Sequence, residues 1–147
     1  MKFIYLILIV LLITSIVTAQ EKKISESEVP KVVVDSFRIK YPEVKTIRWV
    51  SEDNNYEVTF KLEGIKYEAN YSSKGEWIET ARTFKKLELP DSVKTTLQSG
   101  DYAKWKIISL QKVETPEYKL LYMVEVSKNK ESKELYFTPE GVLVKEE

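Results

Sequence analysis

The chain of 147 residues contains no cysteine and no histidine. Without cysteine it can form no disulfide and can carry no lipid on an N-terminal cysteine, so we do not expect a lipoprotein. Without either residue it also lacks the commonest general base, the thiol nucleophile and the usual ligands of zinc, copper and haem. The sequence therefore predicts no cofactor and no metal centre, and it argues against most classes of enzyme.

Glycine and excess charge are also scarce. The four glycines lie at or near expected turns, so no glycine-rich phosphate loop is present. Lysine and arginine together number 23, as do aspartate and glutamate, so no basic excess is available to neutralise phosphates. Nucleic acid is therefore not an expected partner.

The first residues have the layout of an export signal. A lysine is followed by the apolar run FIYLILIVLLI and then by small residues up to Ala19. This order is typical of a secretory signal peptide, residues 1–19, although a membrane anchor is the alternative. The apolar stretch is at the lower limit of the roughly 20 residues that span a bilayer. We expect cleavage after Ala19 or Gln20, and a product in the periplasm or outside the cell without membrane attachment.

A polar segment, residues 20–28, comes next and is expected to be a loose lead-in. After Pro30, apolar residues at steps of four, such as Val33 and Phe37, predict a short amphipathic helix that ends at Pro42. Polar and apolar residues then alternate in four segments separated by short turns. This period of two predicts four antiparallel strands.

The same order returns in the second half of the chain. LPDSVKTTL, which begins at Leu89, matches VPKVVVDSF, which begins at Val29, and LYFTPEGVLVKE echoes ANYSSKGEWIET. The offset between the halves is larger at Gly141, which matches Gly75, and insertions at VETPE and SKNKES would account for the increase. The sequence thus predicts an α+β fold of two tandem repeats, 29–86 and 87–147, each with one helix and four strands. Because a unit of about 60 residues is marginal alone, we expect a single two-layer domain, residues 29–147, with one shared sheet covered by both helices on one face.

This arrangement resembles the PepSY-like family of small secreted bacterial proteins. The resemblance rests on the Val-Pro before the helix, a strand with Trp49, the segments YEVTF and YEANY, and a glycine turn before Trp77. It covers roughly residues 29–147 and implies a fold similar to that of the β-lactamase inhibitory protein, which clamps an enzyme with its concave sheet face. Relatives often carry aspartate in the turns, but here they read SSKG and TPEG, which removes the carboxylates that calcium would need.

Four apolar residues are the candidates for a binding surface. Alternation places Leu121 and Met123 on the outward side of their strand, where our alignment gives the first repeat a threonine and a lysine. Tyr136 stands beside them, and Trp77 is expected to face outward as well. Exposed apolar residues on a sheet often mark a contact surface. The alternative is that a loop, the linker or the N-terminal segment covers them.

Strand glutamates are the remaining route to catalysis. Glu57, Glu68, Glu125 and Glu134 could in principle act as in glycoside hydrolysis, but neighbouring lysines favour cross-strand ion pairs on a solvated face. The leading hypothesis is a secreted, non-enzymatic module that grips a protein or peptide on its open sheet face, as an inhibitor or regulator of an envelope enzyme. An envelope structural or stress-associated protein that associates with itself is the second hypothesis, and a carboxylate hydrolase is the third.

Overall fold

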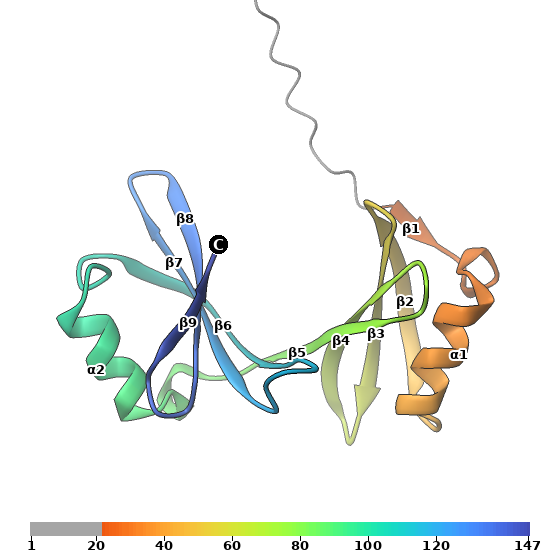
Figure 1. The fold of residues 1–147 in the computed structure, drawn as a ribbon, viewed down its shortest axis with the longest axis horizontal. Coiled ribbons are helices and arrows are strands. Elements are labelled where there is room, and N and C mark those ends of the chain that lie inside the picture. The colour runs from red at the N-terminus through yellow and green to blue at the C-terminus, as the bar shows by residue number, and fades with distance from the viewer. Residues whose placement is uncertain (1–21) are drawn as a thin grey trace, which may run out of the picture.

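The computed structural model describes residues 22–147 (Figure 1). The expected signal peptide, residues 1–19, lies outside the described residues. The elements of the described chain follow in this order: β1 (Lys22–Ile24), the 3-10 turn η1 (Glu26–Glu28), α1 (Lys31–Lys40), β2 (Lys45–Glu52), β3 (Asn55–Leu62), β4 (Ile65–Ser72), β5 (Trp77–Thr83), the 3-10 turn η2 (Lys86–Glu88), α2 (Asp91–Ser99), β6 (Lys106–Glu114), β7 (Leu121–Lys128), β8 (Glu131–Phe137) and β9 (Leu143–Glu146).

The strands of residues 22–147 form one antiparallel sheet in which every strand pairs with its neighbours in sequence, from β1 to β9. This is the α+β class predicted from the sequence. The sheet has nine strands rather than eight, because the lead-in is not loose. Its residues Lys22–Ile24 pair with β2, and the Ser25 backbone N–H donates a hydrogen bond of 2.8 Å to Glu28 Oε2 across η1.

Each helix begins directly after a proline, Pro30 or Pro90, whose carbonyl accepts the first hydrogen bonds of the helix. The spacing of four residues places Val33 and Phe37 on the side of α1 that faces the sheet, where both are fully buried. Neither helix within residues 22–147 is long and apolar enough to cross a membrane. Because both helices are short, they would be unstable alone and are stabilised by packing on the sheet.

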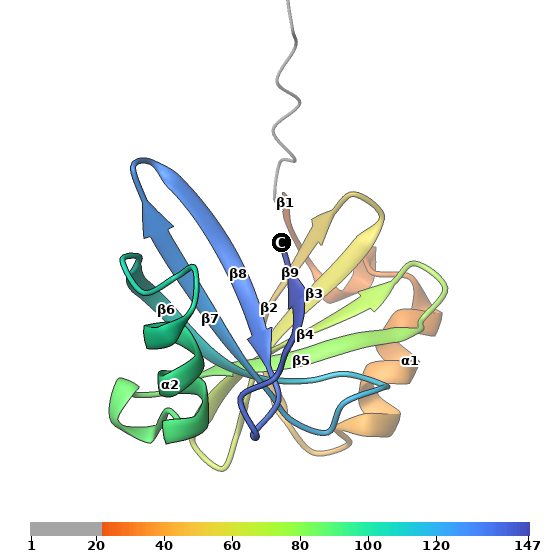
Figure 2. The same cartoon turned by 60° about the vertical axis from the view of Figure 1, so that its left-hand side comes forward.

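Both helices cover the same face of the sheet. Residues that pair directly across an antiparallel ladder point to one side. Ala69 under α1 pairs with Thr80, which in turn pairs with Glu114 across the junction of β5 and β6. Two positions away in β6, Lys112 shares that face and pairs with Tyr122 under α2. The helices lie at the outer ends of the molecule and the sheet bends between them, so the face without helices is concave (Figures 1 and 2).

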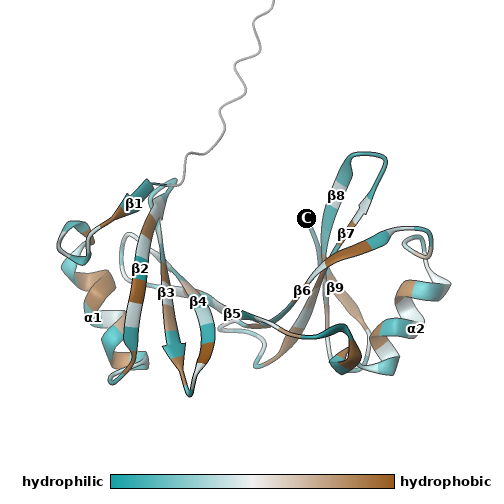
Figure 3. Ribbon diagram, turned by 180° about the vertical axis from the view of Figure 1, so that it is seen from behind, coloured by the Kyte–Doolittle hydropathy of each residue, from teal (hydrophilic) through white to brown (hydrophobic). Residues whose placement is uncertain are grey.

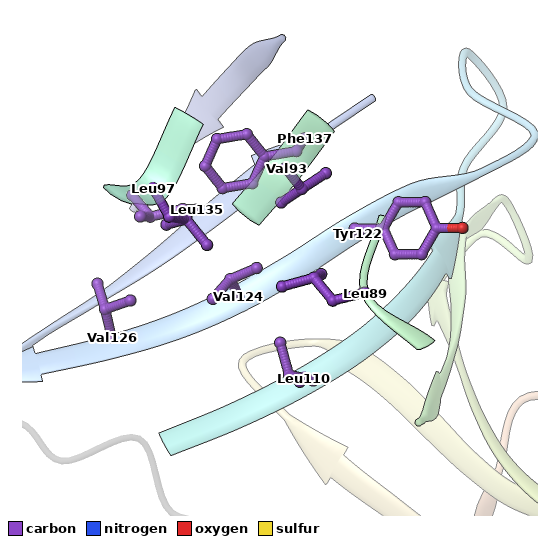
Figure 4. Close-up of a cluster of buried hydrophobic side chains, with 9 residues drawn as sticks. All are labelled: Leu89, Val93, Leu97, Leu110, Tyr122, Val124, Val126, Leu135 and Phe137. Carbon is purple, nitrogen blue, oxygen red and sulfur yellow. The ribbon is translucent and has the colours of Figure 1, made fainter. Parts of the chain in front are cut away.

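Each helix covers its own apolar core. The alternation of polar and apolar residues along the strands can be followed in Figure 3. The core under α1 is rich in aromatic rings and consists of Val29, Val33, Phe37, Trp49, Val58, Phe60, Ala69 and Tyr71. The core under α2 contains mostly aliphatic side chains (Figure 4), namely Leu89, Val93, Leu97, Leu110, Tyr122, Val124, Val126, Leu135 and Phe137.

Four β-bulges interrupt the ladders of the described residues, and they fall at corresponding places in the two halves. The extra residue is Ile47 in β2 and Ile108 in β6, opposite consecutive residues of the next strand. It is Ile78 in β5 and Val144 in β9. A bulge adds one residue to a strand and so reverses the inward and outward alternation beyond it. All four extra side chains are at least 37% exposed.

The extra length of the second half lies in one loop. The ladders match Trp49 with Leu110 and Val58 with Val124, and the second of these pairs is farther apart in the sequence than the first. The offset therefore changes between β6 and β7, in the loop of residues 115–120. The second expected insertion, at SKNKES, is wrong, because the turn there is as short as the turn at Glu63. Leu121 and Met123 consequently correspond to Asn55 and Glu57 of the first half, not to the threonine and lysine of our sequence alignment.

The last hairpin turn of each half packs against the helix of that half. Gly75 and Gly141 both have a positive φ, of 82° and 84°, which favours glycine. A Cβ on Gly75 would lie 2.8 Å from the Val32 carbonyl oxygen, and one on Gly141 would lie 2.7 Å from that of Ser92. Both positions therefore favour glycine for two reasons: the turn needs a positive φ, and the helix lies too close for a Cβ.

Candidate functional site on the concave sheet face

The concave face contains a groove between the two halves of the sheet, with a volume of about 380 Å³. Its walls come from the hairpin of β2 and β3, from β4 and β5, and from β8 and β9 on the other side. Neither helix of residues 22–147 covers this face (Figure 2). Six carboxylate side chains line the groove, namely Glu52, Asp53, Glu57, Glu79, Glu134 and Glu147.

Lys145 is the one cation among the residues that line the groove. Its ammonium group already has partners, because Nζ lies 2.8 Å from Glu147 Oε1 and 4.8 Å from the centre of the Tyr136 ring. Glu57 has a partner outside the lining, since Arg48 Nη2 lies 3.4 Å from its Oε1. The groove still contains more carboxylates than cations and therefore has a negative potential, which a low-dielectric wall on both sides concentrates.

Glu79 is a partly buried carboxylate of the groove. Burial raises its pKa, and the negative charges of Glu134 and Glu147 raise it further, while the hydrogen bond from Asn70 and the charge of Lys145 lower it. The Asn70 Nδ2 donates this bond, with a length of 3.2 Å, to Glu79 Oε1. The charged form of Glu79 is thus poorly solvated, and a cation that entered the groove would stabilise this charged form.

The phenol of Tyr136 is bonded to a carboxylate of its own strand, β8. Its hydroxyl donates a hydrogen bond of 2.9 Å to Glu134 Oε2. Burial, followed by the bond to Glu134 and the nearby negative charges, raises the pKa of Tyr136 well above its usual range. The tyrosine is therefore a neutral hydrogen-bond donor at physiological pH.

Two bulge residues add apolar surface to this polar face. Ile78 is 40% exposed and lines the groove, while Val144 is 37% exposed and lines the adjacent hollow against the loop of residues 115–120. Apolar anchors beside a charged rim are typical of a protein–protein contact.

Three of the predicted binding residues lie together but are not exposed. Met123 pairs with Tyr136, and both pack with Leu121 in one cluster on the concave side. They are only 3–7% exposed, because Tyr118 of the loop of residues 115–120 packs against them. The expectation of an open apolar patch is therefore wrong, and the alternative, a loop that covers these residues, is correct. Their role in binding stays a prediction.

Trp77 lies on the opposite face from the one expected. The extra residue Ile78 reverses the alternation, so Trp77 points to the helix side together with Tyr71. There the indole Nε1 donates a hydrogen bond of 2.9 Å to Thr80 Oγ1, and the Lys40 ammonium lies 3.6 Å from the centre of a Trp77 ring. Trp77 thus supports the junction between the halves and does not line the groove.

The candidate catalytic glutamates are dispersed. Glu57 and Glu134 line the groove, whereas Glu68 forms an ion pair of 2.7 Å with Lys66. Both residues of this pair belong to β4, so it runs along one strand and is not the cross-strand pair that was expected. Glu125 pairs with Glu134 in the ladder. No group of three acidic residues within residues 22–147 is placed to hold a metal ion.

Sequence reasoning missed the contributions of Glu79, Ile78 and Val144. The available signal was a pair of adjacent apolar residues, Trp77-Ile78 and Leu143-Val144, in strands that otherwise alternate. Such a pair indicates a bulge when both side chains cannot face the core.

Within residues 22–147, the curved antiparallel sheet with two helices on its convex side and an open acidic groove defines a small α+β scaffold. The family model described as "Putative beta-lactamase-inhibitor-like, PepSY-like" matches residues 15–63 and 54–145. The chain therefore belongs to the PepSY-like family. No curated protein matches the chain.

Solved structures from Bacteroides share the fold. A DUF2874 family protein from Bacteroides ovatus is 25% identical, with a TM-score of 0.64, over 80% of this chain and 86% of its own. A BLIP-like protein from Bacteroides fragilis is 23% identical, with a TM-score of 0.64, over 79% and 83%. A structure from Bacteroides eggerthii described as "putative periplasmic proteins" is 19% identical, with a TM-score of 0.64, over 80% and 87%.

Proposed function

We propose that the protein is an exported, non-enzymatic binding module that holds a protein or peptide partner on its concave face. The observation that carries this proposal is the groove between the halves, which is lined by six carboxylates and by a single lysine, with Glu57 paired to Arg48 and Lys145 paired to Glu147. A partner that places a basic segment in this groove would meet complementary charge. The exposed side chains of Ile78 and Val144 would supply apolar contact beside it.

The cellular role is that of an inhibitor or regulator of an envelope enzyme. The layout of residues 1–19 and the periplasmic description of the protein from B. eggerthii support export. The family description and the name of the BLIP-like protein from B. fragilis support a regulatory rather than a catalytic role. Fold likeness alone does not identify the enzyme, so the acidic groove is the feature that selects the partner.

We further propose that the two halves are tandem copies of one unit, and that the unit begins earlier than residue 29. Ile24 at the end of β1 pairs with Trp49, as Phe84 after β5 bonds to Leu110 through its backbone N–H. The turns η1 and η2 follow, each with a glutamate that accepts the backbone N–H at its start. β5 therefore closes the first copy and opens the second, which joins both into one concave surface.

A pull-down from periplasmic extract tests the binding face. Wild type, Ile78→Arg in the groove and Ile39→Arg on α1, whose parent side chain is 83% exposed, would be compared as baits. We expect one partner to be retained by wild type and by Ile39→Arg and to be lost from Ile78→Arg at unchanged melting temperature. Loss with Ile39→Arg alone would move the interface to the helix side.

Light scattering of the mature protein tests the self-associating alternative. A binding module for another protein should be monomeric at micromolar concentration, since its groove and its copies carry the same negative charge. A stable dimer that dissociates on Ile78→Arg would instead make a second copy of the chain the occupant of the groove.

A further inference from the structure

A second hollow, on the other face of the sheet, lies between α2, the segment of residues 100–105 and strand β6. Its volume is about 430 Å³, within the range of roughly 300–1,000 Å³ of small-molecule sites. The buried side chains of Leu89, Leu97 and Val126, which belong to the second core (Figure 4), form part of its lining. The hollow therefore opens directly onto the apolar core.

Aromatic rings stand at the corresponding positions of the first half. Phe37 stands where α2 has Leu97, and Phe60 pairs with Thr46 as Val126 pairs with Ile107. The rings of Phe37 and Phe60 meet at 5.3 Å between centroids. Leucine and valine at these two positions are smaller than phenylalanine, which leaves room for the hollow beneath the helix of the second half.

The first half also closes this space with an ion pair. Arg38 Nη2 donates a hydrogen bond of 3.1 Å to Glu26 Oε2, and the Trp49 indole donates to the same oxygen at 3.1 Å. In the second half the first residue of the 3-10 turn is Lys86, not a glutamate, and Gln98 replaces the arginine. No ion pair can form between these two, so the mouth of the hollow stays open.

The mouth is basic as well as open. Lys86, Lys94 and Lys106 line the hollow, and none of the residues that line it is acidic. Lys94 has an exposed ion pair with Asp91 at 2.9 Å. None of the ion pairs within the described part of the chain involves Lys86 or Lys106. An apolar floor beneath unpaired ammonium groups matches a ligand with an apolar chain and an anionic end.

We propose that this hollow is a binding site for a medium-chain fatty carboxylate. The alkyl chain would lie against Leu97, Val126 and Trp105, where burial of each methylene group removes apolar surface from water. The carboxylate would lie at the mouth, between Lys86 and Lys106, where a charge-assisted hydrogen bond is available from each ammonium group. The site is independent of the concave groove, because the two lie on opposite faces of the sheet.

Calorimetric titration of the mature protein with decanoate tests the site. We expect saturable binding at a ratio of one to one, weaker binding of the uncharged decanol, and an affinity for decanoate that falls as salt rises. Lys86→Gln and Lys106→Gln should each weaken decanoate binding about two- to five-fold, as for an exposed ion pair. Lys104→Gln, which alters an exposed lysine of the same segment outside the lining, should leave the affinity unchanged.

Two double variants give the second half the residues found at the matching positions of the first half. Lys86→Glu with Gln98→Arg restores the closing ion pair on the surface, and it should abolish decanoate binding without lowering the melting temperature. Leu97→Phe with Val126→Phe should fill the hollow and have the same effect on binding. Wild-type affinity in the surface variant, equal affinity for decanol and decanoate, or binding to anionic phospholipid vesicles without binding to free decanoate would each overturn the proposal.

Discussion

Alanine substitutions in the cluster beneath the loop of residues 115–120 test whether its side chains are buried or form an exposed patch. Leu121 and Met123 are 3% and 4% exposed, so Leu121→Ala or Met123→Ala should each lower the free energy of unfolding by about 2–5 kcal/mol. Ile78 lies on the same concave face but is 40% exposed, so Ile78→Ala should cost less than about 1 kcal/mol. This difference follows from burial alone, because all three changes remove an aliphatic side chain from one side of one sheet.

Urea unfolding followed by far-UV circular dichroism measures these differences. The midpoint should fall clearly for Leu121→Ala and Met123→Ala at an unchanged slope, and it should barely move for Ile78→Ala. Tyr118→Ala should show part of the same loss, since Tyr118 is the loop residue that packs on the cluster. Equal midpoints for Leu121→Ala and Ile78→Ala would refute the burial and restore an open apolar patch as the binding surface.

Three further changes test the turns, the groove and the junction. Gly64 and Gly75 share a φ near +80°, but only Gly75 faces a helix, so Gly75→Ala should cost about 1–3 kcal/mol more than Gly64→Ala, and equal melting temperatures would contradict the packing. Because burial raises the pKa of Glu79 above its usual 4.5, the stability that its protonated form gives is present below pH 4.5 and is lost as pH rises through the raised pKa. Glu79→Gln should therefore melt higher than wild type at pH 7 and no higher at pH 4, and the reverse order would contradict this sign. Residues 20–86 alone should show no cooperative thermal transition, since β5 would lose β6; a sharp transition would make the halves independent domains.

Periodicity predicted the element types because the repeating contacts are local. Steps of four after Pro30 identified α1 and its buried face, and alternation identified the strands that follow. The lead-in was misjudged because its strand is held by pairing with β2 and not by any apolar pattern of its own, since Lys22 and Lys23 are exposed. Strand pairing between distant residues leaves no mark in a three-residue segment.

The candidate site could be predicted only in part. Glu57 and Glu134 were recognised as outward-facing, but the groove that unites them exists because the sheet bends, and bending is a property of the whole ladder. Trp77 was placed on the wrong face because one bulge at Ile78 reverses the alternation. Leu121 and Met123 were paired with the wrong residues because a single loop holds the whole change in offset.

Site-specific photo-crosslinking in the periplasm tests most directly whether the concave face is the binding surface. A photoreactive phenylalanine analogue would replace Ile78 in the groove or Ile39 on α1, two exposed isoleucines on opposite faces of the sheet. The proposed function predicts a discrete covalent adduct with one partner protein from position 78, lost when Glu79 and Glu134 are changed to lysine, and no adduct from position 39. An adduct from position 39 alone, or an adduct from position 78 that persists after both charge reversals, would contradict it.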